Sequence, residues 1–213
     1  MAKSRLSWIV PAFITGSLLP FASIAWRIDR GHLGANPVAS ALNQVGLLAL
    51  VFLVASLSCT PLKIALGWTW PVRVRRTLGL AGFFSALLHF SIYLVLDQNF
   101  AFGSVVKDVI KRPFIAVGFT ALVLLVPLAL TSTKRSVSRL GFPRWQRLHR
   151  LAYVIGILGV IHFYLRVKAD HTLPIAYGLV LASGFALRFA ASAKKNRDAR
   201  LRAALRSARS GAA

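Results

Sequence analysis

Long apolar runs dominate this 213-residue chain and constrain its fold more than any other feature. A helix needs about 20 mainly apolar residues to cross the hydrocarbon core of a bilayer. Six stretches of this character follow one another: 8–26, 38–58, 77–96, 113–131, 148–165 and 173–189. The segments between them are short and rich in Gly, Pro and polar residues, and Pro61 is expected to lie in such a break. The sequence predicts an all-α, polytopic membrane protein, with a six-transmembrane-helix bundle over 1–192 and a basic cytoplasmic tail over 193–213.

The charge composition excludes most other classes. The chain has 27 Lys and Arg against 5 acidic residues, all Asp, for a net charge of +22. Only 15% of residues are charged, whereas soluble domains carry about 25%. Intrinsic disorder needs low hydrophobicity, but 56% of these residues are hydrophobic. A nucleic-acid binder would spread basic residues over a soluble face. The single cysteine, Cys59, excludes an intramolecular disulfide and a CxxC redox or zinc motif.

The basic residues also predict an orientation. With the N-terminus inside, the cytoplasmic segments 1–7, 59–76, 132–150 and 188–213 hold 20 of the 27 Lys and Arg. Four of the five Asp fall in the outer loops. By the positive-inside rule, both termini are therefore cytoplasmic.

Each end of the chain has two interpretations. Lys3 and Arg5 precede the first apolar run, and residues 23–25 are a passable cleavage site, so a cleaved signal peptide is the alternative to a retained helix. The length of the run favours a retained helix. In the tail from Lys194, Leu201 and Leu205 repeat at helical spacing, which favours a basic interfacial helix on anionic membrane lipid over an RNA-binding arm.

Two histidines supply candidate chemistry inside the membrane, where ionisable side chains are costly and functional by default. His89 lies 12 residues after the predicted start of its helix, and His162 lies 14 after the start of its own. Both helices run outwards, so at 1.5 Å per residue the two depths differ by only about 3 Å. Two imidazoles at one depth on different helices suit the axial positions of a b-type haem iron. The alternative is that each histidine bonds a carbonyl or hydroxyl group of a neighbouring helix.

His149 and Arg75 define an inner layer. His149 precedes His162 by 13 residues, about 20 Å along a helix, which suits a second haem near the inner leaflet. In an ideal helix, however, it points about 140° away from His162, so the helix would have to bend. Arg75 lies 14 residues before His89, where that haem would need its second ligand. Arginine cannot replace imidazole as an axial ligand, but it could bind a haem propionate or a flavin phosphate.

Several stretches resemble a known family. They are GHLGANPV (31–38), CTPLK (59–63), RRTLGL (75–80), ALLHFSIY (86–93), KRPF (111–114) and the long run over 131–165 that contains His149 and His162. They are similar to the haem-binding membrane subunits of bacterial protein-methionine-sulfoxide reductase systems, the MsrQ (formerly YedZ) family. More broadly, they resemble the ferric-reductase-like transmembrane domain shared with NADPH oxidases. The resemblance covers nearly the whole chain apart from its first few residues and the tail.

The resemblance implies a bacterial inner-membrane flavoprotein that binds heme b, in one or two copies, and FMN. It implies electron transfer from quinol or a cytosolic flavin reductase to a periplasmic molybdopterin-containing methionine sulfoxide reductase subunit (MsrP), which repairs oxidised envelope proteins. The family's haem-iron ligands correspond to His89, His149 and His162, while relatives with two stacked haems have a fourth histidine where this chain has Arg75. The inner arginines are candidate partners of the FMN phosphate: Arg73, Arg75, Arg76, Arg144 and Arg147.

On this interpretation the chain is an electron-transfer subunit with no substrate chemistry of its own. A small transporter or channel is the alternative from another class, but the spans lack the chain of carboxylates or pair of broken helices that such proteins use. A ferric reductase of the same fold is the third possibility. The missing cytosolic dehydrogenase domain disfavours it as a self-sufficient enzyme.

Overall fold

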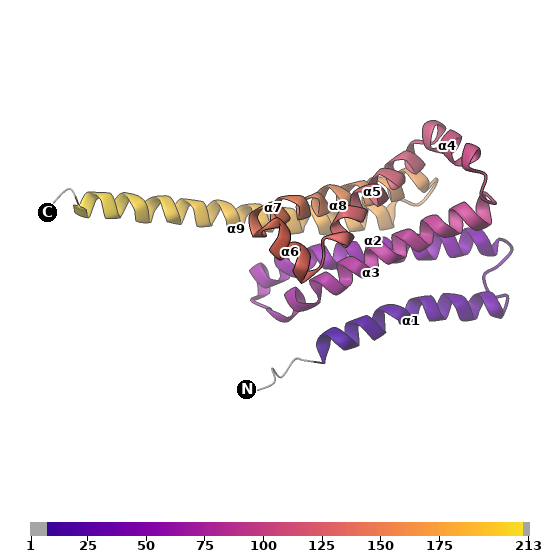
Figure 1. Ribbon diagram of the computed structural model, residues 1–213, viewed down its shortest axis with the longest axis horizontal. Coiled ribbons are helices and arrows are strands. Elements are labelled where there is room, and N and C mark those ends of the chain that lie inside the picture. The colour runs from indigo at the N-terminus through magenta and orange to yellow at the C-terminus, as the bar shows by residue number, and fades with distance from the viewer. Residues whose placement is uncertain (1–7, 211–213) are drawn as a thin grey trace.

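The computed structural model describes residues 8–210, and all regular structure within that range is helical. Lys3 and Arg5, and the last three residues of the tail, lie outside the described residues. Figure 1 shows the elements in order: α1 (Ile9–Asp29), α2 (Pro37–Leu66), α3 (Trp70–Ile92), the π-helical turn η1 (Tyr93–Asp97), α4 (Phe102–Lys111), α5 (Pro113–Leu130), α6 (Lys134–Leu140), α7 (Phe142–His149), α8 (Leu151–Arg166) and α9 (Thr172–Ser210).

Six helical stretches are long and apolar enough to cross a membrane. They are Ile9–Asp29, Pro37–Leu66, Trp70–Asp97, Pro113–Leu130, Phe142–Arg166 and Thr172–Leu205. Each one contains or overlaps one of the six predicted spans, so the predicted all-α, six-helix membrane fold is confirmed.

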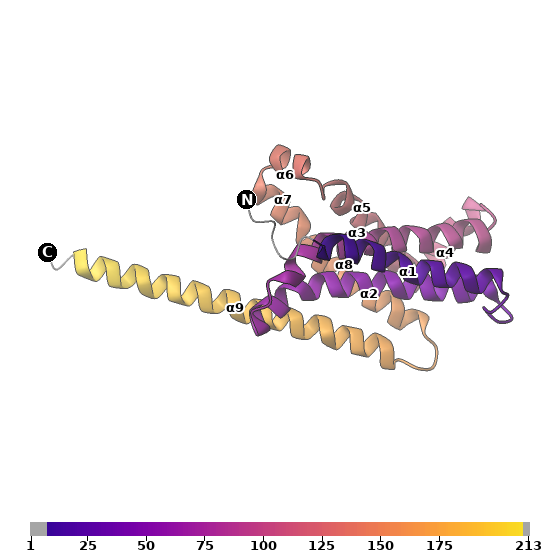
Figure 2. The ribbon, with the colours of Figure 1, turned by 90° about the horizontal axis from the view of Figure 1, so that it is seen from below.

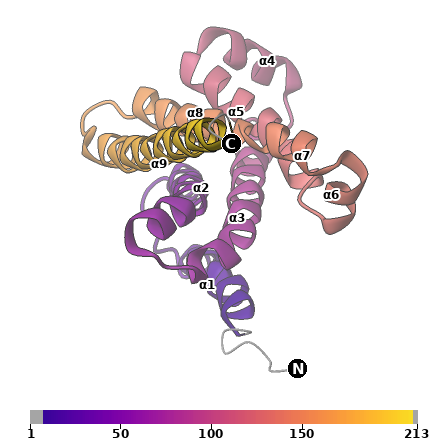
Figure 3. The ribbon, with the colours of Figure 1, turned by 90° about the vertical axis from the view of Figure 1, so that its left-hand side faces the viewer.

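The bundle is built around α2, which packs against α1, α3, α8 and α9, while α5 packs against α3 and α8 (Figure 3). Three clusters of buried apolar side chains hold these helices together. In one of them, Cys59 of α2 is buried with Ile9 of α1 and with Val74 and Leu78 of α3. The first apolar run is thus a packed helix at the edge of the bundle.

The predicted break at Pro61 is wrong, because α2 continues through this proline to Leu66. Proline has no N–H, so the carbonyl of Leu57, four residues earlier, loses its partner in the helix. Arg188 of α9 supplies the missing donor, with its Nη2 2.7 Å from the Leu57 oxygen. Its Nη1 donates to the hydroxyl of Tyr153 on α8 at 2.7 Å. A side chain distant in sequence therefore allows a proline inside this membrane helix.

The last helix also differs from expectation. It begins where Asp170 accepts a hydrogen bond from the Thr172 backbone N–H at 2.9 Å, and hydrogen bonds from Thr172 lower the pKa of the Asp170 carboxyl. It then runs for 39 residues without a break, well past the predicted end of the sixth span. The tail is helical, as its spacing predicts, but Figures 1 and 2 show it extending along α9 beyond the bundle instead of lying across the bundle's end. Since no Gly or Pro interrupts 185–209, nothing turns the chain there.

Candidate cofactor site

The structure brings His89 of α3 and His162 of α8 together. Their ring centroids are 6.2 Å apart and the ring planes are nearly perpendicular, at 81°. The two residues are 73 positions apart in the chain. Both side chains are half-buried, because a cavity separates the helices that carry them.

Each imidazole is fixed in the same way by a neighbouring helix. His89 Nδ1 lies 2.9 Å from the Leu42 carbonyl oxygen of α2, and His162 Nδ1 lies 2.6 Å from the Phe114 carbonyl oxygen of α5. A carbonyl only accepts, so Nδ1 is the protonated nitrogen in both rings. The Nε2 nitrogen of each ring then carries a lone pair that can bind a metal.

A glycine makes each of these contacts possible. Gly46 follows Leu42 by four residues, and Gly118 follows Phe114 by four, so each glycine lies one helical turn beyond the accepting carbonyl. A Cβ at Gly46 would lie 2.9 Å from the His89 ring, and one at Gly118 would lie 2.6 Å from the His162 ring. Any larger residue at these positions would displace the imidazoles.

The cavity beside the two histidines has a volume of about 300 Å³, at the lower end of the range for small-molecule sites. Its walls are mainly aliphatic and aromatic, from α2, α3, α5 and α8: Leu42, Leu47, Leu50, Leu53, Phe90, Phe119, Leu122, Leu125, Ile155 and Phe163. Two cations, Arg112 and Arg166, are also in its lining. Arg166 donates a hydrogen bond to the Asn43 side chain. Arg166 makes no ion pair with any described carboxylate.

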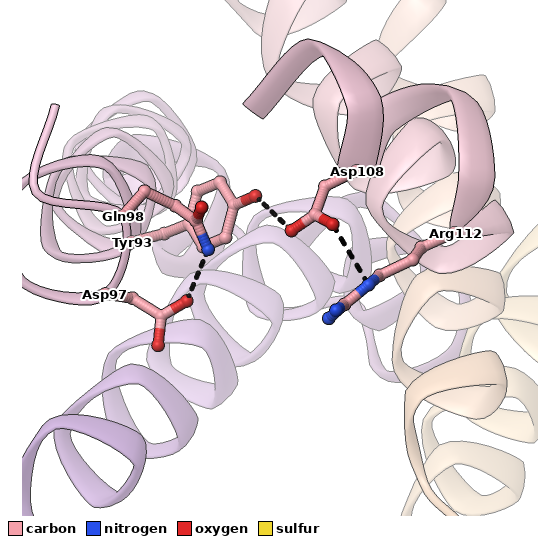
Figure 4. Close-up of polar contacts among 5 residues, drawn as sticks. All are labelled: Tyr93, Asp97, Gln98, Asp108 and Arg112. Atoms are coloured by element: carbon pink, nitrogen blue, oxygen red, sulfur yellow. Dashed lines mark hydrogen bonds and ion pairs between the residues drawn. The ribbon is translucent and has the colours of Figure 1, made fainter. Parts of the chain in front are cut away.

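Arg112 belongs to a polar network beside this cavity (Figure 4). Its Nε lies 3.1 Å from a carboxylate oxygen of Asp108, and the other oxygen of that carboxylate accepts a hydrogen bond from the Tyr93 hydroxyl at 2.9 Å. In η1, Asp97 accepts a hydrogen bond from Gln98 at 3.0 Å. Tyr93 and Asp97 also line the cavity. The π-helical turn after His89 thus connects the cavity wall to α4, as π-bulges often do beside functional sites.

The geometry suits one metal between the two rings. Metal–imidazole bonds are about 2 Å long, and a ring nitrogen lies roughly 1.1 Å from the ring centre, given ring bonds of about 1.35 Å. Two imidazoles on opposite sides of one metal therefore have centroids about 6 Å apart, as these do. Among the described residues, no three His, Cys, Asp or Glu gather to hold a bare ion. A metal here would take its remaining ligands from a macrocycle such as a haem.

A second cavity of about 580 Å³ lies towards the predicted inner side of the bundle. We call it the inner cavity, and the cavity beside His89 and His162 the outer cavity. It shares the side chains of Leu53 and Leu125 with the outer cavity, so the two have a common wall. Within the described part of the chain its lining holds no carboxylate but four cationic residues: Arg75, Arg76, Lys134 and Arg150. Aromatic residues complete it, from α3, α7 and α8: Phe83, Phe142, Trp145 and Tyr153. This combination suits a flat ligand that carries negative charge.

His149 lines the inner cavity and is not brought to the histidine pair. Its Nε2 lies 3.0 Å from the Thr131 hydroxyl, and its ring stacks on Trp145 with centroids 4.1 Å apart. The Trp145 indole N–H donates to the Thr131 carbonyl at 2.9 Å, which fixes this stack. Arg75 reaches the hydroxyl of Thr60 at 3.5 Å. The structure therefore places His149 and Arg75 together at the inner cavity, away from the histidine pair.

Sequence reasoning found some of these residues and missed others. Of the predicted phosphate partners, Arg75 and Arg76 line the inner cavity, whereas Arg73, Arg144 and Arg147 do not. It missed the lining residues Lys134, Arg150, Arg112 and Arg166, and the two glycines beside the histidines. A glycine inside an apolar run is a weak signal, and only the fold shows which side chain packs against it.

Comparison with known proteins identifies relatives across almost the whole chain. The family model "Ferric reductase like transmembrane component" matches residues 40–160. A protein of Deinococcus radiodurans is 50% identical over 194 residues, covering 91% of this chain and 96% of its own. One of Rhodospirillum rubrum is 43% identical over 198 residues, covering 93% and 94%. One of Herminiimonas arsenicoxydans is 44% identical over 180 residues, covering 84% and 83%. All three are named protein-methionine-sulfoxide reductase heme-binding subunit MsrQ.

Proposed function

The chain belongs to the MsrQ family of protein-methionine-sulfoxide reductase haem-binding subunits, and from this premise we propose that it carries electrons across the membrane through a b-type haem held by His89 and His162. The observation that carries the proposal is the 6.2 Å separation of the two imidazole rings. That separation fits two nitrogen ligands on opposite faces of one haem iron. The apolar walls of the cavity fit the macrocycle.

A bound haem would supply a one-electron relay that the side chains of this protein lack. His89 and His162 would hold the haem iron from the two helices that carry them, α3 and α8. The hydrogen bonds from Nδ1 to Leu42 and Phe114 orient the two rings and raise the basicity of Nε2. Arg166, which has no carboxylate partner among the described residues, is placed to pair with a propionate.

The inner cavity is the proposed entry point for electrons. Its four cations match the phosphate of FMN, and its aromatic side chains match a flavin ring. The proposed donor is quinol or a cytosolic flavin reductase. Leu53 and Leu125 line both cavities, so a flavin held in the inner cavity would lie across an apolar wall from the histidine pair.

The proposed acceptor is a periplasmic molybdopterin-containing methionine sulfoxide reductase, MsrP, that repairs oxidised envelope proteins. Support comes from the family of the relatives and from the position of the histidine pair towards the predicted outer side of an inner-membrane bundle. If both histidines hold the haem, this subunit would transfer electrons and leave substrate chemistry to its partner. The histidine pair also disfavours a transporter or channel.

The visible spectrum of the purified protein, oxidised and then reduced with dithionite, tests the proposal. A low-spin b-type spectrum is expected, and His89→Ala and His162→Ala should each remove most of it. The double variant should be little worse than the worse single one, because the ligands of one metal act as a unit. A colourless protein after haem-replete expression would overturn the proposal and revive the transporter.

A further inference from the structure

Helix α4 has an unusual position for a segment of an outer loop. It joins the outer end of the third span to the start of α5 and lies crosswise to the spanning helices at the edge of the bundle, as the view along the bundle in Figure 3 shows. A helix in this position lies near the plane of the membrane surface.

An apolar stripe on α4 is not covered by any of the residues that the structure describes. At 100° per residue, Phe102, Val106 and Ile110 fall within about 80° of one another around the helix. Their side chains are 65%, 59% and 78% exposed, respectively. Leu96 at the end of the third span and Phe100 in the turn before α4 are also exposed. Exposed apolar residues therefore continue along the chain from the third span into the stripe.

A neighbouring side of α4, next to the stripe, is fixed to the bundle. Val105 is 8% exposed, and Asp108 binds both the Tyr93 hydroxyl and Arg112 (Figure 4). These contacts set the rotation of the helix about its axis. The stripe therefore cannot turn inward to bury itself against the protein.

We propose that α4 is a lipid-binding helix that inserts this stripe into the outer leaflet of the membrane. Lys107 and Lys111 lie beyond the edge of the stripe, where their ammonium groups reach lipid phosphates while the stripe contacts acyl chains. An apolar face flanked by lysines, at the boundary of a membrane span, matches a bilayer surface better than an aqueous protein partner. Lipid contact would then hold Asp108, and through it Arg112, at the mouth of the outer cavity.

Depth-dependent quenching tests this inference on the full chain, reconstituted in phosphatidylcholine–phosphatidylglycerol vesicles with brominated acyl chains. Val106→Cys is labelled with the environment-sensitive fluorophore NBD, and Ser104→Cys is the matched control. The two positions are two residues apart but point about 160° apart around the helix. The native Cys59 is 2% exposed, so the wild-type chain taken through the same labelling gives the blank.

The label at position 106 should emit at shorter wavelength and be quenched severalfold by brominated lipid, whereas the label at 104 should show neither effect. Emission at 106 that is water-like and unquenched, in a sample with wild-type helical content by circular dichroism, would overturn the inference. Adding Lys107→Gln and Lys111→Gln should reduce quenching at 106 at least twofold. Unchanged quenching would overturn the role of the lysines. Neither readout depends on haem, so the result is independent of the proposed electron transfer.

Discussion

Replacing Gly118 with Ala should weaken haem binding through a single added methyl group. The Cβ would lie 2.6 Å from Nδ1 and 2.7 Å from Cε1 of His162. An ordinary contact starts at 3.4 Å, so the ring must retreat by about 0.8 Å, the difference between 3.4 and 2.6 Å. Metal–ligand distances in a proper site vary by only about 0.2 Å. The displaced imidazole can therefore no longer reach the iron without moving α5 or α8.

The free-energy cost has two parts. Inserting a methyl group into a packed site costs about 1–3 kcal/mol. Moving the ring also breaks the 2.6 Å bond from Nδ1 to the Phe114 carbonyl, worth about 0.5–1.5 kcal/mol. Even the lower values together correspond to roughly a tenfold loss of haem affinity, since 1.4 kcal/mol is one factor of ten.

Haem per protein, measured as the pyridine haemochrome, and the low-spin signal in electron paramagnetic resonance report the effect. Gly178→Ala is the matched control, because its Cβ would make an ordinary 3.5 Å contact with Val160. Gly46→Ala should have a smaller effect than Gly118→Ala, since its Cβ would lie 2.9 Å from the His89 ring. If Gly118→Ala keeps as much low-spin haem as Gly178→Ala, His162 does not hold the iron from this position.

Three further predictions test other parts of the molecule. His149→Ala should retain the low-spin haem signal, because the ring lines only the inner cavity. Stopped-flow measurements should show slower haem reduction by a cytosolic-side flavin donor, and loss of all haem would contradict this prediction. Reporter fusions after Asp97 or Asp170 should be active in the periplasm and one after Arg135 in the cytoplasm, and the opposite pattern would reverse the orientation. Arg188→Leu should destabilise the protein by about 1–3 kcal/mol, because it leaves the Leu57 carbonyl buried without its donor. The midpoint of thermal unfolding in detergent should fall, and an unchanged midpoint would mean that the helix tolerates an unpaired carbonyl.

Hydropathy and length predict the six spans well because every bilayer-crossing segment must satisfy its own backbone and present apolar side chains. The same logic fails at Pro61, where the helix continues because Arg188 supplies a hydrogen bond from 131 residues away. It also fails for α4, since a ten-residue amphipathic helix is too short to stand out in a transmembrane window. Both features depend on contacts with residues distant in sequence, which a hydropathy pattern does not identify.

The histidine pair could be predicted for a simple reason: depth along a helix is linear in residue number. The lateral neighbours of a side chain, in contrast, cannot be calculated from residue number. That Gly46 faces His89 and Gly118 faces His162 depends on how α2 packs on α3 and α5 on α8, which apolar runs do not encode. Arg166 lies just beyond the predicted span 148–165, yet it lines the cavity because it follows His162 by one helical turn.

The inner layer differs from the outer one in the charge that it accepts. The outer site offers two imidazoles with free Nε2 atoms, whereas at the inner site the Nε2 of His149 is already hydrogen-bonded to Thr131. Arg75 lines the same cavity as His149, and a guanidinium has no lone pair to offer a metal. The cations around it repel a ferric centre and attract a phosphate or a reduced flavin anion. The cationic lining that includes Arg75 thus favours an anionic electron donor over a second haem. We therefore predict one haem per chain, measurable against protein mass in the purified sample. Two haems per chain would refute this prediction.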